Sequence, residues 1–249
     1  MKYIQSAQNR QIKQWKKLLT KKERDKTGTF LVEGFHLVEE AIKADVALEI
    51  IVCEGVELPP HMDYGSISLT TVTPEIFREL SDTETPQGVL ALCEAQKEVE
   101  ELKGKQFLLI DAVQDPGNLG TMIRTADAAG MDGIIVGHGS VDIYNPKVIR
   151  SAQGSHFHLP VVRGALKEWM EKLLAKNIPI YGTSLENGQI YTEISPSPSF
   201  ALLVGNEGSG VDPDLLQKTT KNLYIPLFGK SESLNVAVAA GILLYYMKA

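Results

Sequence analysis

Short apolar runs alternate with amphipathic helical patterns through the second half of the chain. The apolar runs predict strands at residues 107–110, 133–136, 178–181, 200–204 and 223–225. Apolar residues at helical spacing predict helices at residues 119–129, 167–176 and 233–247. Fully apolar strands separated by helices are typical of a parallel sheet that is covered on both faces. We therefore expect an α/β fold in this part of the chain.

The first part of the chain shows the same alternation on a smaller scale. The pattern predicts strands at residues 29–33, 48–53 and 89–93 and helices at residues 36–44 and 74–80. Together they form an α/β unit of roughly ninety residues, which is a plausible size for a domain. A charged segment with few bulky side chains follows. We predict a smaller α/β domain at 1–97, a linker at 98–105 and a second domain at 106–249.

The composition is that of an ordinary globular protein, with 43% hydrophobic and 22% charged residues among 249. Cys53 and Cys93 are far apart and lack CxxC spacing, which argues against a disulfide framework or a zinc site. The first six residues lack the apolar core of a signal peptide, and the longest apolar stretch, 236–247, is too short to span a bilayer. We expect a cytoplasmic protein without a membrane partner.

The charge is distributed unevenly along the chain. The net charge is −6, yet residues 1–26 carry nine Lys and Arg residues against two acids, which gives +7 locally and leaves −13 for the rest. Such a cluster is typical of a surface that attracts phosphates. The same segment has an apolar stripe (Ile12, Trp15, Leu18 and Leu19), so it also fits a packed helix with solvated lysines. The sequence leaves both interpretations open.

Three segments rich in Gly and Asn stand at or near the ends of predicted strands. In the first, residues 115–120 form a turn in which Asn118 is suited to cap the following helix, and Arg124 lies within that helix. In the second, residues 205–210, Glu207 lies among the glycines. Open α/β sheets bind ligands at the carboxyl ends of their strands, so we expect a site where these segments meet.

The third segment comprises Ile225 and Pro226 at a strand end, followed by residues 231–235. Ser231 or Ser233 is suited to cap the last helix, with Asn235 in its first turn. Taken singly, each of the three segments is also explained as an ordinary helix start or turn.

Other chemistries find less support in the sequence. The second segment loosely matches a dinucleotide-binding glycine pattern, so an NAD-dependent oxidoreductase stays open as an alternative, but the required βαβ unit and acid are not evident. A Walker-type Gly-Lys-Ser/Thr and a G-x-S-x-G elbow are both absent, which argues against a nucleotide triphosphatase and an α/β-hydrolase. His156 and His158 alternate on a predicted strand without a third ligand, so we expect no metal.

Taken together and in this order, the three segments resemble the motifs of the SpoU/TrmH family of RNA ribose methyltransferases, in the SPOUT superfamily. The matching residues are 115–120 with 124–130, then 204–210, then 225–226 with 233–239. In the first domain, residues 30–36 and 85–88 are similar to the substrate-binding domain of the family members that modify ribosomal RNA.

This resemblance implies a parallel sheet with a deep trefoil knot and a homodimer formed through the knotted domain. It also implies methyl transfer to a ribose 2′-hydroxyl of RNA, with ribosomal RNA as the expected partner. The alternatives are a transfer-RNA 2′-O-methyltransferase or a non-catalytic RNA-binding protein of the same fold.

The cofactor implied by the resemblance is S-adenosylmethionine. Its binding residues, by position, are Thr183, Ser184, Leu185, Val204, Gly205, Asn206, Gly208, Gly210, Ile225, Pro226, Leu227, Ser233, Leu234 and Asn235. The resemblance also implies that Arg124 takes part in catalysis, and we expect it to clamp a phosphate beside the target ribose rather than act as a literal base. We expect Glu207 to orient that guanidinium, with Asn118, Ser233 and Asn235 fixing substrate and cofactor.

Overall fold

The computed structural model describes residues 2–97 and 99–248, and the chain divides into two compact units. The first unit comprises Met1–Lys97 together with Tyr144–Phe157, and the second comprises Glu98–Ile143 together with His158–Ala249. Residues 144–157, which follow a strand of the second unit in the sequence, therefore pack with the first unit.

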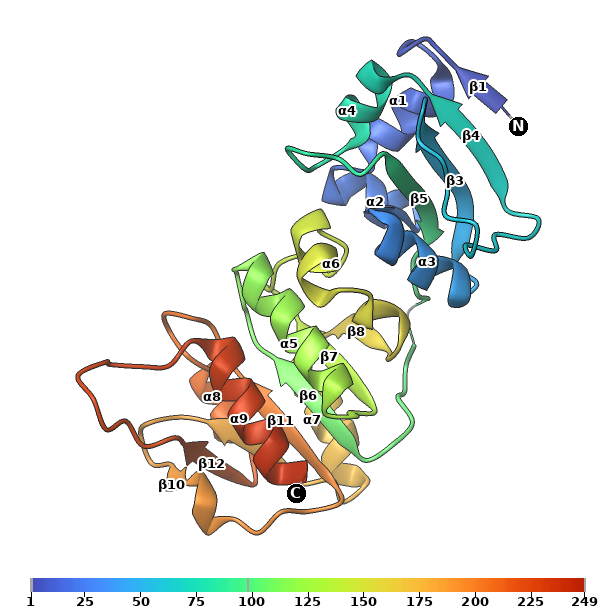
Figure 1. Cartoon of the computed structure of the whole chain (residues 1–249). Coiled ribbons are helices and arrows are strands. Elements are labelled where there is room, and N and C mark those ends of the chain that lie inside the picture. Colours follow the sequence, from blue (N-terminus) through green and yellow to red (C-terminus); the bar gives the residue numbers. More distant parts are fainter. Residues whose placement is uncertain (1, 98, 249) are drawn as a thin grey trace. The chain divides into compact units, whose positions relative to one another are not determined.

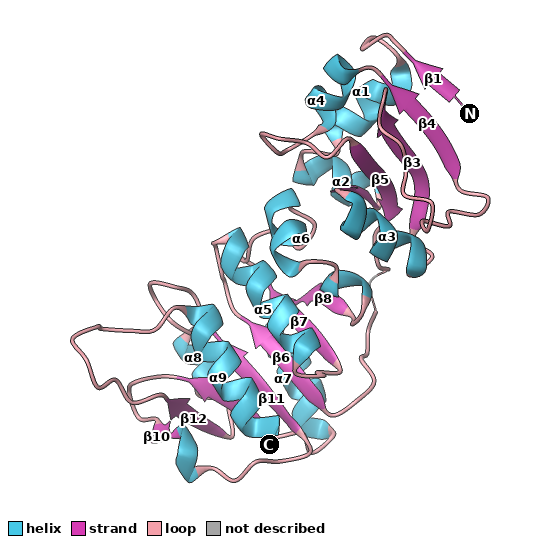
Figure 2. Cartoon of the chain, in the orientation of Figure 1, coloured by secondary structure: helices cyan, strands magenta, loops and turns pink. Residues whose placement is uncertain are grey.

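The first unit contains a five-stranded mixed sheet (Figures 1 and 2). Its order is β1 (Lys2–Ile4), β4 (Ser68–Val72), β3 (Ala47–Cys53), β5 (Val89–Glu94) and β2 (Thr29–Glu33). The pairs β1–β4 and β4–β3 are parallel, whereas β5 is antiparallel to both β3 and β2. The helices of this unit are α1 (Arg10–Lys17), α2 (Lys21–Thr27), α3 (Phe35–Lys43), α4 (Pro74–Leu80) and α6 (Pro146–Ala152), with the 3₁₀ turn η1 (Ser155–Phe157).

Alternating side chains of this sheet form two cores, one on each face. Phe30 and Ile50 pack with residues of α3 and with Ile149 of α6 on one face. Leu31 and Ile51 pack on the other face, with α1 and α4. There Ile12 and Trp15 are almost fully buried, so the predicted apolar stripe of the basic segment is a real packing surface.

The second unit contains a seven-stranded sheet in which every pair is parallel. Its order is β10 (Gln189–Ile190), β12 (Lys221–Tyr224), β9 (Ile180–Thr183), β11 (Phe200–Val204), β6 (Gln106–Ile110), β7 (Gly133–Gly137) and β8 (Val161–Gly164). The helices are α5 (Pro116–Ala128), α7 (Leu166–Ala175), α8 (Pro213–Leu216) and α9 (Val236–Lys248), with the 3₁₀ turn η2 (Tyr191–Glu193).

The helices of the second unit form two layers around this sheet. Helix α5 packs against α9, and the two contact β7 and β11 (Figure 1). On the other face, Trp169 and Leu173 of α7 pack with strand residues such as Phe107 and Leu109, and Leu215 of α8 packs at the edge of this core. The expected α/β fold with a covered parallel sheet is confirmed.

Several local expectations are corrected by the structure. Helix α5 begins at Pro116 rather than at 119, and α9 begins at Val236 rather than at 233. His156 lies in the 3₁₀ turn η1 and not on a strand. The short elements β1, β4, β8, β10, α6 and α8 carry too little periodicity to be predicted. Across residues 2–97 and 99–248, no helix is long and apolar enough to cross a membrane.

Candidate active site at the strand ends of the second unit

The three Gly- and Asn-rich segments meet at one edge of the parallel sheet. Strands β12, β9, β11 and β6 are neighbours, so their carboxyl ends lie side by side. The first segment follows β6, the second follows β11, and the third follows β12. The loop after β9, which begins at Ser184, is at the same edge. This is the position at which open α/β sheets bind ligands.

Glu207 joins the second segment to the first. Its Oε1 accepts hydrogen bonds from the Asp115 backbone N–H at 3.0 Å and from the Asn118 side-chain amide at 3.0 Å. Its Oε2 accepts a hydrogen bond from the Gln114 backbone N–H at 3.1 Å. A carboxylate has lone pairs for all of these donors, so one side chain fixes the start of α5.

Asn118 and Asn235 join the first segment to the third. The Asn235 side-chain amide donates to Asn118 Oδ1 at 2.8 Å. Asn235 Oδ1 accepts hydrogen bonds from the backbone N–H groups of Ala237 and Val238, which makes Asn235 the cap of α9. A continuous chain of hydrogen bonds therefore runs from Glu207 through Asn118 to Asn235.

The helix caps differ from those that the sequence predicts. Asp115, not Asn118, is the N-cap of α5, because its Oδ1 accepts from the Asn118 backbone N–H at 2.8 Å and Pro116 occupies the first turn. Asn118 is thereby free to bond Glu207 and Asn235. Neither Ser231 nor Ser233 caps α9: the Ser231 hydroxyl donates to the Ser233 carbonyl instead.

The second segment is a tight loop closed on itself. Asn206 and Gly210 exchange two backbone hydrogen bonds, and Asn206 Oδ1 accepts from the N–H groups of Gly208 and Ser209. The Asn206 amide donates to the Ala112 carbonyl at 2.8 Å, which ties the loop to the end of β6. A Cβ on Gly205 would lie 2.2 Å from the Gly210 carbonyl carbon, so only glycine fits there.

Two carboxyls near this edge have opposite pKa shifts. Partial burial alone would raise the pKa of Glu207, but the hydrogen bonds from Asn118, Gln114 and Asp115 outweigh it and lower that pKa below its usual range. Burial raises the pKa of Asp111, which accepts one hydrogen bond from the Asp212 backbone N–H at 2.8 Å. The charged form of Glu207 is thus the one that the site stabilises.

Arg124 and Ser233, the other two predicted catalytic residues, lie outside this network. Arg124 is exposed on α5, and within residues 2–97 and 99–248 its side chain makes no hydrogen bond or ion pair. The expected contact between Glu207 and Arg124 is therefore not formed, because the Glu207 carboxylate is occupied by the start of α5. Ser233 is exposed, and its hydroxyl has no partner among the described residues.

The predicted cofactor residues border the same edge. The Thr183 hydroxyl donates to the Leu203 carbonyl, and the Ser184 N–H donates to the Leu223 carbonyl. Two large apolar side chains of these loops are exposed: Leu185 at 64% and Leu234 at 37%. Residues 225–227 are half-buried, and Val204 and Gly205 are buried at the end of β11.

Gln114 and Asp115 were not predicted as site residues, although both donate to Glu207. Asp115 could have been recognised from the Asp-Pro pair, since Asp at the N-cap and Pro at the first helical position are a common helix start. Gln114 takes part only through its backbone, and no sequence signal marks it.

Comparison with known proteins gives the family. Residues 105–245 match the SpoU rRNA Methylase family, and residues 9–91 match the MRM3-like substrate binding domain. The first match covers more than half of the chain, so the chain belongs to the SpoU rRNA methylase family. The family expected from the three motifs is confirmed.

Relatives and solved structures agree with this assignment. The 23S rRNA (guanosine(2553)-2'-O)-methyltransferase RlmP of Bacillus subtilis (strain 168) is 54% identical over 249 residues, which is 100% of both chains. A 23S rRNA (uridine(2479)-2'-O)-methyltransferase of Streptomyces viridochromogenes is 30% identical, with 96% of this chain and 90% of the relative covered. The crystal structure of an AdoMet-bound rRNA methyltransferase from Sinorhizobium meliloti has a TM-score of 0.88 at 28% identity, with 99% of this chain and 97% of that one covered.

Proposed function

We propose that this protein transfers a methyl group from S-adenosylmethionine to the 2′-hydroxyl of a ribose in 23S ribosomal RNA. The observation that carries the proposal is the hydrogen-bonded chain Glu207–Asn118–Asn235, which joins all three motifs at one edge of the sheet. The relative that is 54% identical over the whole of both chains is named as a methyltransferase of guanosine 2553 in 23S rRNA. The equivalent guanosine is therefore the first target to test.

The charge of the loops fits S-adenosylmethionine better than a dinucleotide. Residues 183–188, 204–210 and 225–235 contain three glutamates (Glu186, Glu207 and Glu232) and one lysine, Lys230. A nicotinamide dinucleotide would bring two phosphates into this acidic surrounding, whereas the sulfonium of S-adenosylmethionine is a cation. This argues against the oxidoreductase alternative.

The residues that would hold the cofactor are the fourteen predicted ones in these loops. Leu185 and Leu234 offer exposed apolar surface for a purine ring, and the backbone of residues 204–210 and 225–227 offers hydrogen-bonding groups. When bound, S-adenosylmethionine supplies a methyl group that its sulfonium already activates. The protein then has to align the hydroxyl and assist its deprotonation.

Arg124 is the residue that we assign to the ribose. Its guanidinium is exposed and unpaired within the described residues, so it is available to a phosphate of the RNA. A guanidinium has N–H donors and no acceptor, so Arg124 would polarise the hydroxyl and clamp the phosphate rather than remove the proton itself. Glu207 has an indirect role, because it fixes the first turn of the helix that carries Arg124.

We further infer a trefoil knot in the second unit. Strand β12 lies beyond β9 in the sheet, yet α9, which follows it in the chain, packs on α5 and β11. Residues 225–235 must therefore pass back across the ends of the intervening strands, which supports the knot implied by the motifs.

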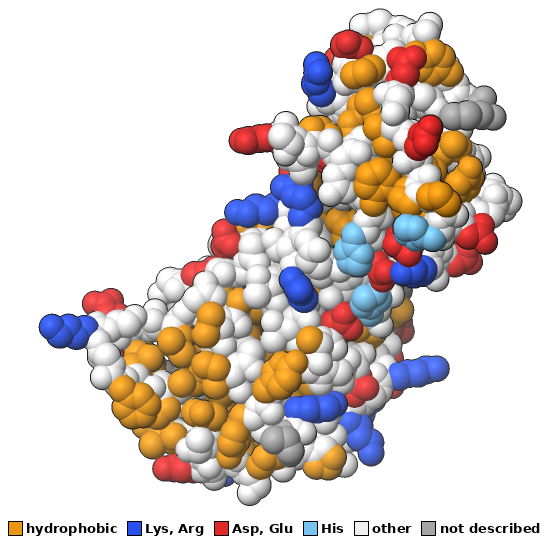
Figure 3. All heavy atoms as spheres, viewed as in Figure 1, with side chains coloured by type: hydrophobic (Ala, Val, Ile, Leu, Met, Phe, Trp, Pro, Cys, Tyr) orange, Lys and Arg blue, Asp and Glu red, His pale blue; other side chains and the backbone are white. Residues whose placement is uncertain are grey.

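A homodimer through the second unit is supported by the surface of α9. Val238, Ile242 and Tyr245 are 51%, 36% and 55% exposed and recur at i, i+4 and i+7, so they form an apolar stripe. Figure 3 shows hydrophobic side chains gathered over the second unit, where Figure 1 places α9.

An rRNA substrate would place the enzyme in the cytoplasm.

Replacing Arg124 tests the proposed mechanism. We expect Arg124→Ala to lower methyl transfer to 23S rRNA by at least about a hundredfold, while S-adenosylmethionine binding, measured by calorimetry, stays at the wild-type value. Thermal stability should not change, because the side chain has no bonding partner among the described residues. Lys167→Ala, at an exposed cation of α7, is the matched control. Turnover retained by Arg124→Ala would remove this residue from the mechanism.

A further inference from the structure

Helix α1 of the first unit carries a stripe of cations on its exposed side. Arg10, Lys13 and Lys17 recur at i, i+3 and i+7, and all three are exposed. At 100° per residue they fall within a sector of about 60°, and the stripe extends over about 10 Å of helix. The helix has no acidic residue of its own.

These three cations are unpaired, whereas three other lysines of the same segment are paired. Within the described residues, the side chains of Arg10, Lys13 and Lys17 make no ion pair or hydrogen bond. By contrast, three nearby lysines each pair with a carboxylate: Lys16 with Glu79 at 2.9 Å, Lys21 with Asp25 at 2.6 Å and Lys26 with Glu23 at 3.6 Å. Three unpaired cations of the segment therefore share one face of α1, and Lys22 of α2 is a fourth exposed cation without a partner among the described residues.

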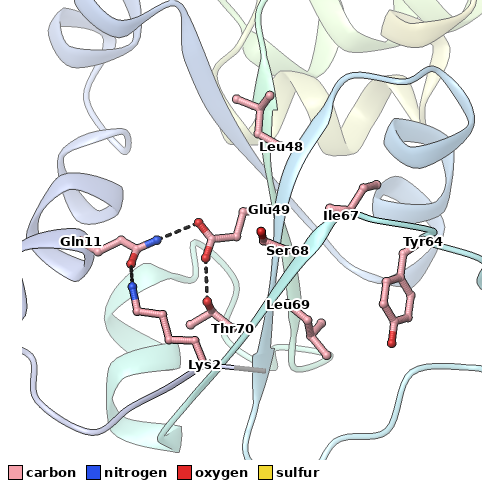
Figure 4. Close-up of a pocket in the computed structure, with 9 residues that line it drawn as sticks. All are labelled: Lys2, Gln11, Leu48, Glu49, Tyr64, Ile67, Ser68, Leu69 and Thr70. Carbon is pink, nitrogen blue, oxygen red and sulfur yellow. Dashed lines mark hydrogen bonds between the residues drawn. The ribbon is translucent and has the colours of Figure 1, made fainter.

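The sheet holds this helix in a fixed orientation. Ile12 and Trp15, on the opposite side, are 1% and 3% exposed. Figure 4 shows the Gln11 amide reaching across to Glu49 of β3, to which it donates a hydrogen bond of 2.7 Å. Asn9 caps the helix by accepting from the Gln11 backbone N–H. The cations thus project from a rigid support, which lowers the conformational cost of using them in binding.

We propose that the α1 face formed by Arg10, Lys13 and Lys17 binds the phosphate backbone of the RNA substrate. The proposal rests on the proposed function, which supplies an RNA. A chain of net charge −6 repels a polyanion as a whole, so RNA binding needs a local surface of opposite charge. This face provides one, and it falls within residues 9–91, which match a substrate-binding domain. It contributes affinity without reading sequence, because it offers no base-reading pattern.

The test compares two triple variants that lose the same formal charge. Arg10→Gln/Lys13→Gln/Lys17→Gln removes the unpaired face, and Lys16→Gln/Lys21→Gln/Lys26→Gln removes the three paired lysines. The affinity of each full-length protein for a 23S rRNA transcript is measured between about 50 and 200 mM salt. Each phosphate contact contributes about 0.7–0.9 to the slope of log affinity against log salt.

We expect the first variant to lose about two units of that slope and to bind on the order of tenfold more weakly at low salt. The control should keep the wild-type slope, and both variants should melt at the wild-type temperature. Equal slopes for the two variants would overturn the proposal, because the effect would then be one of net charge. Methyl transfer by the wild-type protein is measured in the same preparation. Its absence contradicts the proposed function, whereas transfer by the wild type combined with equal slopes contradicts this surface alone.

Discussion

Glu207 is the residue that connects the loops of the site, and its partners explain why a carboxylate stands among glycines. Two backbone N–H groups and one side-chain amide donate to it, so its negative charge is stabilised without a cation. Arg124 is therefore not needed to balance this charge, which is consistent with the RNA contact that we propose for it. The sequence marked Glu207, Asn118, Asn235 and Arg124 as members of one site, because motif order carries that information. It could not assign their partners, since those depend on which backbone amides reach the carboxylate.

Glu207→Gln should slow methyl transfer on the order of tenfold, because the amide cannot accept hydrogen bonds at both ends as the carboxylate does.

The same variant also tests whether the pKa of Glu207 is lowered in the folded protein. Since the pKa of folded Glu207 is lowered, its contribution to stability is present at neutral pH and lost as the pH falls through that lowered value. Melting curves from about pH 7 to pH 3 should therefore fall less steeply for Glu207→Gln than for the wild type.

Glu193→Gln is the matched control for this residue, since Glu193 is exposed in η2 and makes no side-chain hydrogen bond among the described residues. It should follow the wild type in both rate and melting. If Glu207→Gln also had the wild-type rate and melting curve, the Glu207 carboxylate would not be fixing the loops of the site.

Among the elements, α5 and α9 show what the spacing of apolar residues predicts about a helix and what it does not. Both helices were predicted, because their apolar residues recur at helical spacing, but both predicted starts were wrong by three residues. The reason lies in tertiary contacts. Asn118 and the serines are good capping residues, yet Asp115 and Asn235 take that role, while Asn118 is used between the helices. The short edge strand β10 pairs only with β12, and α8 packs at the edge of the core after a local start signal, Asp212–Pro213.

The apolar stripe of α9 gives a prediction about assembly. Tyr245→Glu should convert a dimer into a monomer, because it puts a charge at the most exposed position of the proposed apolar contact. Light scattering coupled to size-exclusion chromatography measures the mass directly. Leu174→Glu, at a 39% exposed position of α7, should leave the dimer intact. A wild-type monomer, or a Tyr245→Glu variant that stays dimeric, would contradict an interface through this helix.

For the molecule as a whole, the central strands of both sheets were predictable, but the short edge strands and the packing of residues 144–157 were not. Buried strands have strong local signatures, which is why β2 and β11 have the predicted bounds. Helix α4 also has the predicted bounds, because Pro74 marks its first turn. Residues 144–157 follow β7 in the sequence, yet Tyr144, Ile149 and Phe157 pack in the core with Phe30. Hydrophobic periodicity says which residues are buried and does not say against which sheet. The knot that we infer is likewise a property of the chain path, which local patterning does not encode.

The most direct test of the central claim is a methylation reaction with purified components. The full-length protein is incubated with S-adenosylmethionine and unmodified 23S rRNA, and the RNA is then digested and mapped by mass spectrometry. We predict one new 2′-O-methylguanosine, at the nucleotide equivalent to guanosine 2553 of the Bacillus subtilis relative's substrate, and none with Arg124→Ala. A methyl group on a base, or no methyl group in the 23S rRNA, would contradict the account.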